Sequence, residues 1–122
     1  VLAGVYEADV LILATPVYWG DVSAQMKGFI DRTYSFLTPG FMTETIKHRL
    51  PPGKTLVFIQ SQAAQAEMFG DLFPRYNQFF EQLPFFSAHH LLIGGGLNAA
   101  GEATERPDLL EKAHRIADAL TT

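Results

Sequence analysis

The sequence has no cysteine, no cluster of positive charge and no long apolar run, and each absence excludes a class of function. Without cysteine, the chain can form no disulfide and has no thiolate nucleophile. It also has no cysteine that could bind a metal ion or an iron–sulfur cluster. Its nine lysines and arginines are scattered and the net charge is -4, so there is no nucleic-acid footprint and no polybasic membrane-binding segment. The longest apolar run, Val10 to Ala14, is far short of a membrane span.

What remains is the composition of one globular domain. The 122 residues are 48% hydrophobic and 18% charged, which suits a chain that buries roughly two-thirds of its unfolded surface around one core. Ten phenylalanines, four tyrosines and one tryptophan are generous for this length, so we expect some rings at an interface or a ligand. No basic stretch followed by an apolar one opens the sequence, which makes a cytoplasmic protein the default expectation.

Apolar runs alternate with helix-like segments, and this order predicts an α/β fold with a parallel sheet. The three runs cover residues 9–14, 54–60 and 89–93. Each is continuously apolar rather than alternating, which is typical of strands that are buried on both faces. Pro16 is expected to end the first of these strands.

Capping residues and apolar spacing predict three longer helices. The first is capped by Ser23 or Asp21 and runs to about Phe36, and the second begins after Asp71. The third opens on Asp108 and Glu111, which have the spacing of a capping box. A further short helical turn is expected within residues 43–49, and residues 1–7 resemble the end of a helix.

In a parallel sheet ligands bind at the carboxyl ends of the strands, so the site is expected in the loops that follow them. These loops are residues 15–21, 61–65 and 94–101. The first carries a rigid proline, two aromatic rings and a glycine, which together suit a planar ligand. Gly94 to Gly96 lack the G-x-G-x-x-G pattern of a dinucleotide site and are interpreted as a flexible loop.

Residues 8–33 (ADVLILATPVYWGDVSAQMKGFIDRT) resemble the core signature of the NAD(P)H-dependent FMN reductases, a family with a flavodoxin-like fold. The shared pattern is an apolar strand, then P-x-Y, then a helix with K-x-x-x-D-R. The resemblance continues to the end of the chain and covers nearly all of it, through Gly53-Lys54, Gly101-Glu102, Pro107 and Leu110 to Ala113.

This resemblance implies that FMN is the cofactor and NAD(P)H the co-substrate, with electrons passed to a quinone, azo compound, free flavin or metal complex. The ring of FMN would lie against Thr15, Pro16, Val17, Tyr18, Trp19 and Gly20. Ser61, Gln62 and Ala63 would approach its polar edge. The cofactor carries the chemistry, so no catalytic side chain and no metal ligand is expected. A homodimer or homotetramer is expected, with no nucleic-acid or membrane partner.

One departure from the family leaves alternatives open. Its members begin with a strand and a Ser/Thr-rich loop that holds the FMN phosphate, and neither precedes Val1 here. Residues 1–122 are therefore expected to be a single but N-terminally incomplete domain, with Asp9 to Ala14 as a bare sheet edge. A flavodoxin-like electron carrier and a truncated domain that binds no cofactor remain alternative functions.

Other residues have ordinary structural interpretations. Tyr18 and Trp19 could be core or dimer-interface aromatics. Lys27 and Asp31 stand four residues apart on a predicted helix and are expected to form a structural ion pair. His89 and His90 point to opposite faces of a strand, so they are not expected to share a metal ion.

Overall fold

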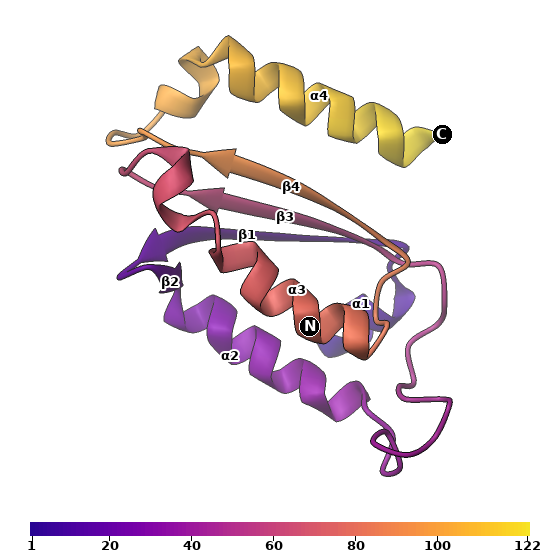
Figure 1. Cartoon of the computed structure of the whole chain (residues 1–122). Coiled ribbons are helices and arrows are strands. Elements are labelled where there is room, and N and C mark those ends of the chain that lie inside the picture. Colours follow the sequence, from indigo (N-terminus) through magenta and orange to yellow (C-terminus); the bar gives the residue numbers. More distant parts are fainter.

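One four-stranded sheet, in the order β2-β1-β3-β4, forms the centre of the domain in a computed structural model that describes all of residues 1–122 (Figure 1). β1 (Val10–Tyr18), β3 (Thr55–Ser61) and β4 (Ala88–Gly94) are parallel. β2 (Asp21–Val22) pairs antiparallel with the end of β1. The three parallel strands predicted from the sequence are therefore confirmed.

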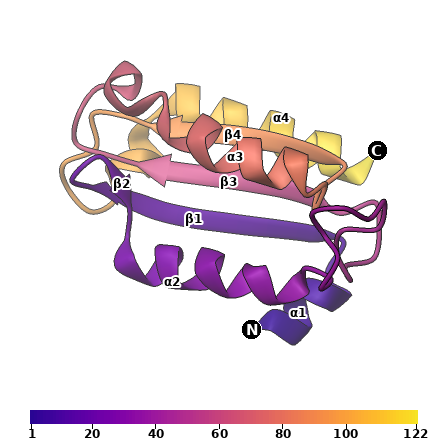
Figure 2. The ribbon, with the colours of Figure 1, turned by 60° about the horizontal axis from the view of Figure 1, so that its bottom comes forward.

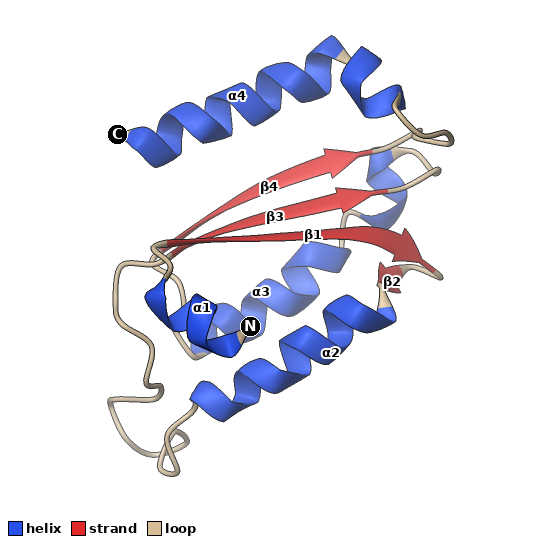
Figure 3. Ribbon diagram, turned by 180° about the vertical axis from the view of Figure 1, so that it is seen from behind, coloured by secondary structure: helices blue, strands red, loops and turns tan.

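Helices cover both faces of the sheet, which gives the three layers expected of the fold (Figure 3). On one face lie α1 (Leu2–Glu7), α2 (Ala24–Arg32) and α3 (Leu72–Gln82). α4 (Pro107–Thr121) lies alone on the other face, and Figure 2 shows it running along β4. Three short 3₁₀ helices complete the chain, at Thr33–Phe36, Ala66–Phe69 and Glu102–Glu105.

The core lies between the sheet and α1 to α3. Side chains from β1 and β3 meet a row of large apolar residues from α3, and further rings from the connections close the ends of this layer. Its fully or almost fully buried members include Leu13, Leu56, Phe58, Leu72, Phe73, Phe80 and Phe85. This single core holds fixed the carboxyl ends of the strands, where the predicted site lies.

α2 begins and continues as its sequence predicts. The Ser23 hydroxyl caps it by accepting a hydrogen bond of 3.2 Å from the backbone N–H of Met26. After Arg32 the helix tightens to a 3₁₀ turn that ends at Phe36, the predicted end. Lys27 and Asp31 form the predicted ion pair, but both side chains are at least half exposed, so the pair contributes little to stability.

Most of β1 has a neighbouring strand on only one side. It pairs with β3 from Val10 to Pro16, whereas β2 pairs only with Val17 and Tyr18 on the opposite side. The outer backbone groups of Val10 to Pro16 therefore have no neighbouring strand, and Ile12 is 57% exposed. This is the bare apolar edge that the sequence predicts.

The prediction that Pro16 ends the first strand is wrong, because β1 continues through Val17 to Tyr18. Proline lacks one N–H but its fixed φ is compatible with an extended strand. Asp21 and Val22 then return along the end of β1 as a hairpin. The first predicted loop is therefore mostly strand, with a two-residue turn at its tip.

Three local predictions about helices are also wrong. Residues 43–49 contain turns and a single bridge from Leu37 to His48 but no helical turn, which fits their β-branched Thr43, Thr45 and Ile46. Asp71 stands at the start of α3 but its carboxylate pairs with Arg75 instead of capping the helix.

Asp108 fails as a cap for a different reason. α4 begins at Pro107, which places Asp108 inside the first turn. The guanidinium of Arg106 holds its carboxylate by two hydrogen bonds of 2.9 Å. Asp108 therefore stabilises the connection before α4 through Arg106. Its negative charge also interacts favourably with the positive N-terminal end of the helix.

Lys54 is a buried cation that ties the start of β3 to the end of α1. Its Nζ donates hydrogen bonds to the backbone oxygens of Tyr6, at 2.8 Å, and Ala8. The side chain is only 4% exposed, so water cannot easily replace these bonds. Lys54 thus satisfies carbonyl groups that the end of a helix leaves without partners.

We expect Lys54→Met to lower the free energy of unfolding by about 1.5 kcal/mol, because two buried carbonyl groups lose a charged donor. Urea denaturation at neutral pH measures this change. The exposed Lys112→Met is the matched control and should alter stability by less than about 0.5 kcal/mol. Equal effects of the two substitutions would show that the Lys54 contacts add nothing to stability.

Candidate functional site

The tip of the β1–β2 hairpin has an unusual backbone conformation. Val17 pairs with Val22 and Tyr18 with Asp21, so Trp19 and Gly20 alone form the turn. Both have positive φ, 51° for Trp19 and 76° for Gly20, as a type I′ hairpin turn requires. Asparagine or glycine usually occupies the first of these positions, and a tryptophan there costs about 1–2 kcal/mol.

The two aromatic rings of this hairpin face solvent. Trp19 is fully exposed and Tyr18 is 62% exposed. The interpretation that they are core aromatics is therefore wrong. A large exposed ring on a strained backbone gains little from burial, which points to a binding role for the hairpin.

The other residues of the first predicted loop support this tip. The buried hydroxyl of Thr15 accepts a hydrogen bond of 3.0 Å from the Ser23 N–H and donates one of 2.8 Å to the Pro16 oxygen. Pro16 and Val17 are half-buried within β1. Gly20 packs against the ring of Phe69, where an added Cβ would lie 3.3 Å from a ring carbon.

The second predicted loop lies beside the first. Ser61 is the register partner of Pro16 across the β1–β3 pair, and both Ser61 and Ala63 are exposed. Gln62 is buried, and its Nε2 donates a hydrogen bond of 2.7 Å to the Gln65 oxygen. The fold therefore brings Pro16 to Ser61 as predicted, while the Gln62 side chain serves to hold its own loop.

Gln60, which no sequence pattern singled out, is fully buried near the end of β3. Its Nε2 donates hydrogen bonds to Gln62 Oε1 at 2.9 Å and to the Phe69 oxygen at 3.2 Å. Its Oε1 is buried without a partner. Since Gln62 is itself oriented by Gln65, the Gln60 amide cannot be reversed. The sequence did contain a signal for it, because Gln60 is a single amide side chain at the end of an apolar run.

The third loop, interpreted from the sequence as flexible, is joined to the second loop by backbone hydrogen bonds at its start. The N–H of Gln62 donates to the Gly94 oxygen and that of Gly96 to the Ala64 oxygen, both at 2.9 Å. These bonds continue the β3–β4 pairing beyond the strand ends. A Cβ on Gly95 would lie 2.4 Å from the Ala66 nitrogen, so the close contact of the two loops requires glycine there.

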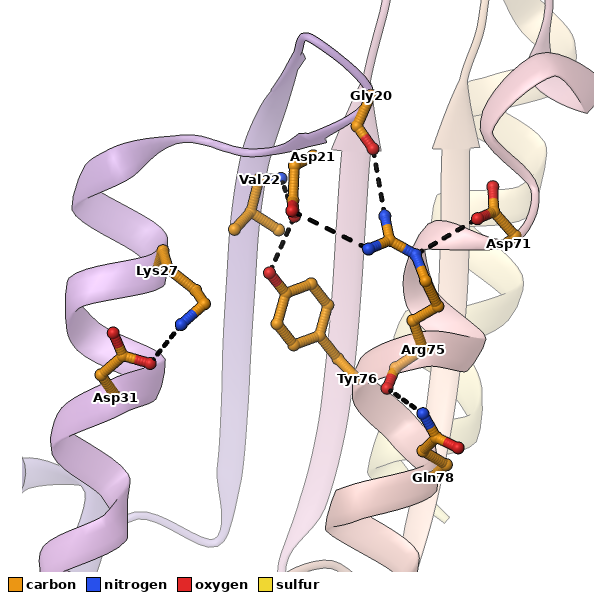
Figure 4. Close-up of polar contacts among 9 residues, drawn as sticks. All are labelled: Gly20, Asp21, Val22, Lys27, Asp31, Asp71, Arg75, Tyr76 and Gln78. Carbon is orange, nitrogen blue, oxygen red and sulfur yellow. Dashed lines mark hydrogen bonds and ion pairs between the residues drawn. The ribbon is translucent and has the colours of Figure 1, made fainter.

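The hairpin also has a charged support on α3, shown in Figure 4. The carboxylate of Asp21 accepts hydrogen bonds of 2.7 Å from the Tyr76 hydroxyl and from the Val22 N–H. Arg75 donates a hydrogen bond of 3.1 Å to the Gly20 oxygen, and its guanidinium lies 3.8 Å from the Asp21 carboxylate. Asp71 holds the same guanidinium at 3.2 Å.

These contacts shift the pKa values of Asp21 and Tyr76. Burial acts to raise the pKa of Asp21, but hydrogen bonds from Tyr76 and Val22 and the charge of Arg75 outweigh it and hold that pKa below its usual value. Burial, and then the hydrogen bond to the Asp21 carboxylate, raise the pKa of Tyr76 to about 12. The pair therefore keeps an ionised carboxylate and a neutral phenol at neutral pH.

The lowered pKa of Asp21 gives stability a definite pH dependence. The stabilisation is complete above the unfolded-state pKa of about 3.9 and is lost as pH falls through the lower folded-state pKa. We expect the stability advantage of the unmodified chain over Asp21→Asn to shrink as pH is lowered from 7 to 3. Urea denaturation over this range measures it. Asp118→Asn, which removes no ion pair, should show no such change.

A wide cleft on the helical side of the sheet does not coincide with the predicted site. It has a volume of about 730 Å³ and lies between α2 and α3, with Tyr34 and Phe79 among its lining residues. None of the nine predicted cofactor-binding residues lines it, although Asp21, Arg75 and Tyr76 do. The predicted site is an open surface at the strand ends, which explains why it forms no comparable hollow.

No side chains are gathered for a metal ion. The chain has no group of three histidine, cysteine, aspartate or glutamate residues placed to hold one. His89 pairs in register with Leu56 and contacts the ring of Phe73, whereas His90 pairs with Val57 and lies on the opposite face. No helix is both long enough and apolar enough to cross a membrane.

Comparison with known proteins agrees with this architecture. A family model for the flavodoxin-like fold matches residues 3–113. The Trp repressor binding protein of Bacillus subtilis superimposes with a TM-score of 0.66 at 23% sequence identity, covering 93% of this chain and 66% of the other. A candidate quinone reductase of Klebsiella pneumoniae gives a TM-score of 0.64 at 19% identity, covering 98% and 53%.

These likenesses to solved structures concern the fold. The chain spans about two thirds of the length of the Bacillus protein and about half of the Klebsiella protein. No curated protein sequence matches it.

Proposed function

The chain belongs to the flavodoxin-like fold family, and from that premise we propose that it is an FMN-dependent NAD(P)H oxidoreductase of the flavin or quinone reductase type. The observation that carries the proposal is the strained, solvent-facing Tyr18-Trp19 hairpin at the carboxyl end of β1. In open parallel sheets this edge is where ligands bind. The quinone reductase description of the Klebsiella protein supports the same class of reaction.

The residues at this edge fit the ring of a flavin. Tyr18 and Trp19 offer exposed aromatic surface, and Pro16 and Ser61 bring the ends of two neighbouring strands together. We propose that Pro16, Val17, Tyr18, Trp19 and Gly20 hold one side of the ring, with the buried Thr15 supporting them from below, and that Ser61 and Ala63 approach its polar edge from the loop that Gln62 holds in place. When bound, FMN would supply the acceptance of hydride from NAD(P)H and its transfer to a small acceptor.

The charges at this edge suggest that the phosphate is held elsewhere. Arg75 is paired with Asp21 and Asp71, and Arg106 is paired with Asp108. Neither guanidinium is free to neutralise a phosphate. We therefore assign only the ring to these loops. A homodimer or homotetramer and a cytoplasmic location form part of the same proposal.

The first test is the visible spectrum of the purified chain before and after addition of FMN, followed by desalting. Retained flavin absorption, with the ring spectrum perturbed by stacking, is the expected result. A colourless chain that retains no FMN would refute the cofactor assignment and leave a domain of this fold that binds no flavin.

The second test separates a reductase from an electron carrier. The FMN-loaded chain is mixed anaerobically with NADH or NADPH, and the flavin absorption is followed. A reductase bleaches the flavin directly, and quinone then restores its colour. A flavin that stays oxidised until a partner reductase is added would favour the carrier.

A further inference from the structure

α3 reaches across to the hairpin and holds its strained turn, although the two segments lie 55 residues apart in the sequence. Arg75 binds the Gly20 oxygen inside the turn, and Tyr76 binds the Asp21 carboxylate directly after it. Both contacts come from consecutive residues near the start of the helix (Figure 4). The turn therefore has a support outside its own two strands.

The hairpin needs such a support because its own pairing is minimal. β2 has only two residues, and only two register pairs join it to β1. A two-stranded hairpin is marginal in water even when it is longer. The positive φ of Trp19 adds strain that these two pairs must also offset.

The guanidinium of Arg75 is itself fixed in place. It is held between two carboxylates, those of Asp21 on the hairpin and Asp71 at the start of α3. Tyr76 supplies a second, independent contact to Asp21. Two carboxylates, one guanidinium and one phenol thus form a connected group whose only link to Trp19 is the backbone of Gly20 and Asp21.

We propose that Arg75 and Tyr76 are positioning residues that fix the Tyr18-Trp19 hairpin in the conformation that receives the ligand. They touch the turn but not the exposed ring, so they act on binding through the placement of Trp19. The part of this inference that concerns FMN rests on the proposed function, whereas the placement of Trp19 does not.

The placement can be measured without flavin, because Trp19 is the only tryptophan in the chain. Time-resolved fluorescence anisotropy of the flavin-free chain reports the local motion of its ring. Arg75→Gln and Tyr76→Phe should each increase the amplitude of fast motion. The matched control, Asn77→Ala, lies on the same helix and removes only a hydrogen bond to Glu81, so it should leave the anisotropy unchanged.

The effect on the ligand is then tested with FMN. Arg75→Gln should raise the FMN dissociation constant about fivefold, the equivalent of one hydrogen bond. In the Trp19→Asn background the same substitution should have almost no effect, because the ring that it positions is gone. Arg75→Lys keeps the charge near Asp21 and should restore part of the affinity.

The outcomes separate the two proposals. Unchanged Trp19 motion in both variants would overturn the positioning role, whatever FMN does. Additive effects of Arg75→Gln and Trp19→Asn on FMN affinity would overturn it as well, because they would show that Arg75 acts independently of the ring. Increased Trp19 motion in a chain that retains no FMN would support the positioning role and refute the cofactor assignment.

Discussion

Trp19→Asn is expected to make the chain more stable and its site weaker. Asparagine tolerates the positive φ at the tip of the hairpin, so the free energy of unfolding should rise by about 1 kcal/mol. Loss of the exposed ring should weaken FMN binding by about 2 kcal/mol, roughly 30-fold, by analogy with the stacking of nucleobases on aromatic side chains. Urea denaturation and fluorescence titration with FMN measure the two changes.

Trp19→Phe is the matched variant, because phenylalanine keeps an aromatic ring and the strained backbone. It should leave stability unchanged and retain most of the FMN affinity. If Trp19→Asn lowered stability, the ring would be contributing to folding despite its exposure. If it left the FMN dissociation constant unchanged, the ring would point away from the flavin.

Phe58→Ala should destabilise the domain more than any other substitution considered for this chain. Phe58 is fully buried on the central strand β3, and its ring lies 5.1 Å from that of Phe73. Removing a ring from such a position costs about 3–5 kcal/mol, since packing contacts are lost and a cavity remains. The total free energy of unfolding of many small domains is only about 5–15 kcal/mol.

The change is measured by urea denaturation, with circular dichroism as the probe. Phe79→Ala on α3 is the control, because Phe79 is 55% exposed. This substitution should lower the free energy of unfolding by less than about 1 kcal/mol. Similar losses for the two substitutions would mean that the side of the sheet facing α3 is not the packed core of the domain.

The three parallel strands and the longer helices could be predicted because their signal is local. Each of β1, β3 and β4 is a short apolar run, and the helices between them show apolar residues at helical spacing. Alternation of the two element types then leaves a parallel sheet as the simple arrangement. The Ser23 cap was equally local, since it depends on a residue three positions away.

The hairpin could not be predicted because nothing local indicates it. Trp19-Gly20 is not a typical turn sequence for two paired strands, and Pro16 is usually a sign that a strand ends. The contacts that hold the turn come from Arg75 and Tyr76, far along the chain. Asp71 and Asp108 show the converse, since a nearby arginine holds each carboxylate that local rules assign to a cap.

The predicted loops meet at one edge of the sheet, but several of their side chains do not face that edge. The fold brings Pro16 beside Ser61, as parallel strands require. Thr15 and Gln62 prove to be buried and engaged within the protein, and Gln60 joins them. The path of the whole loop decides which side chains face solvent at the end of a strand. A pattern of residue types along the sequence does not specify that path.

The one-sided pairing of β1 determines how its amides exchange with solvent deuterium. Along Val10 to Ala14, alternate N–H groups point toward β3, while those between them point toward the side without a strand. The first set is protected by the sheet and the second is open to water. This one strand should therefore give alternating slow and fast exchange rates from one residue to the next.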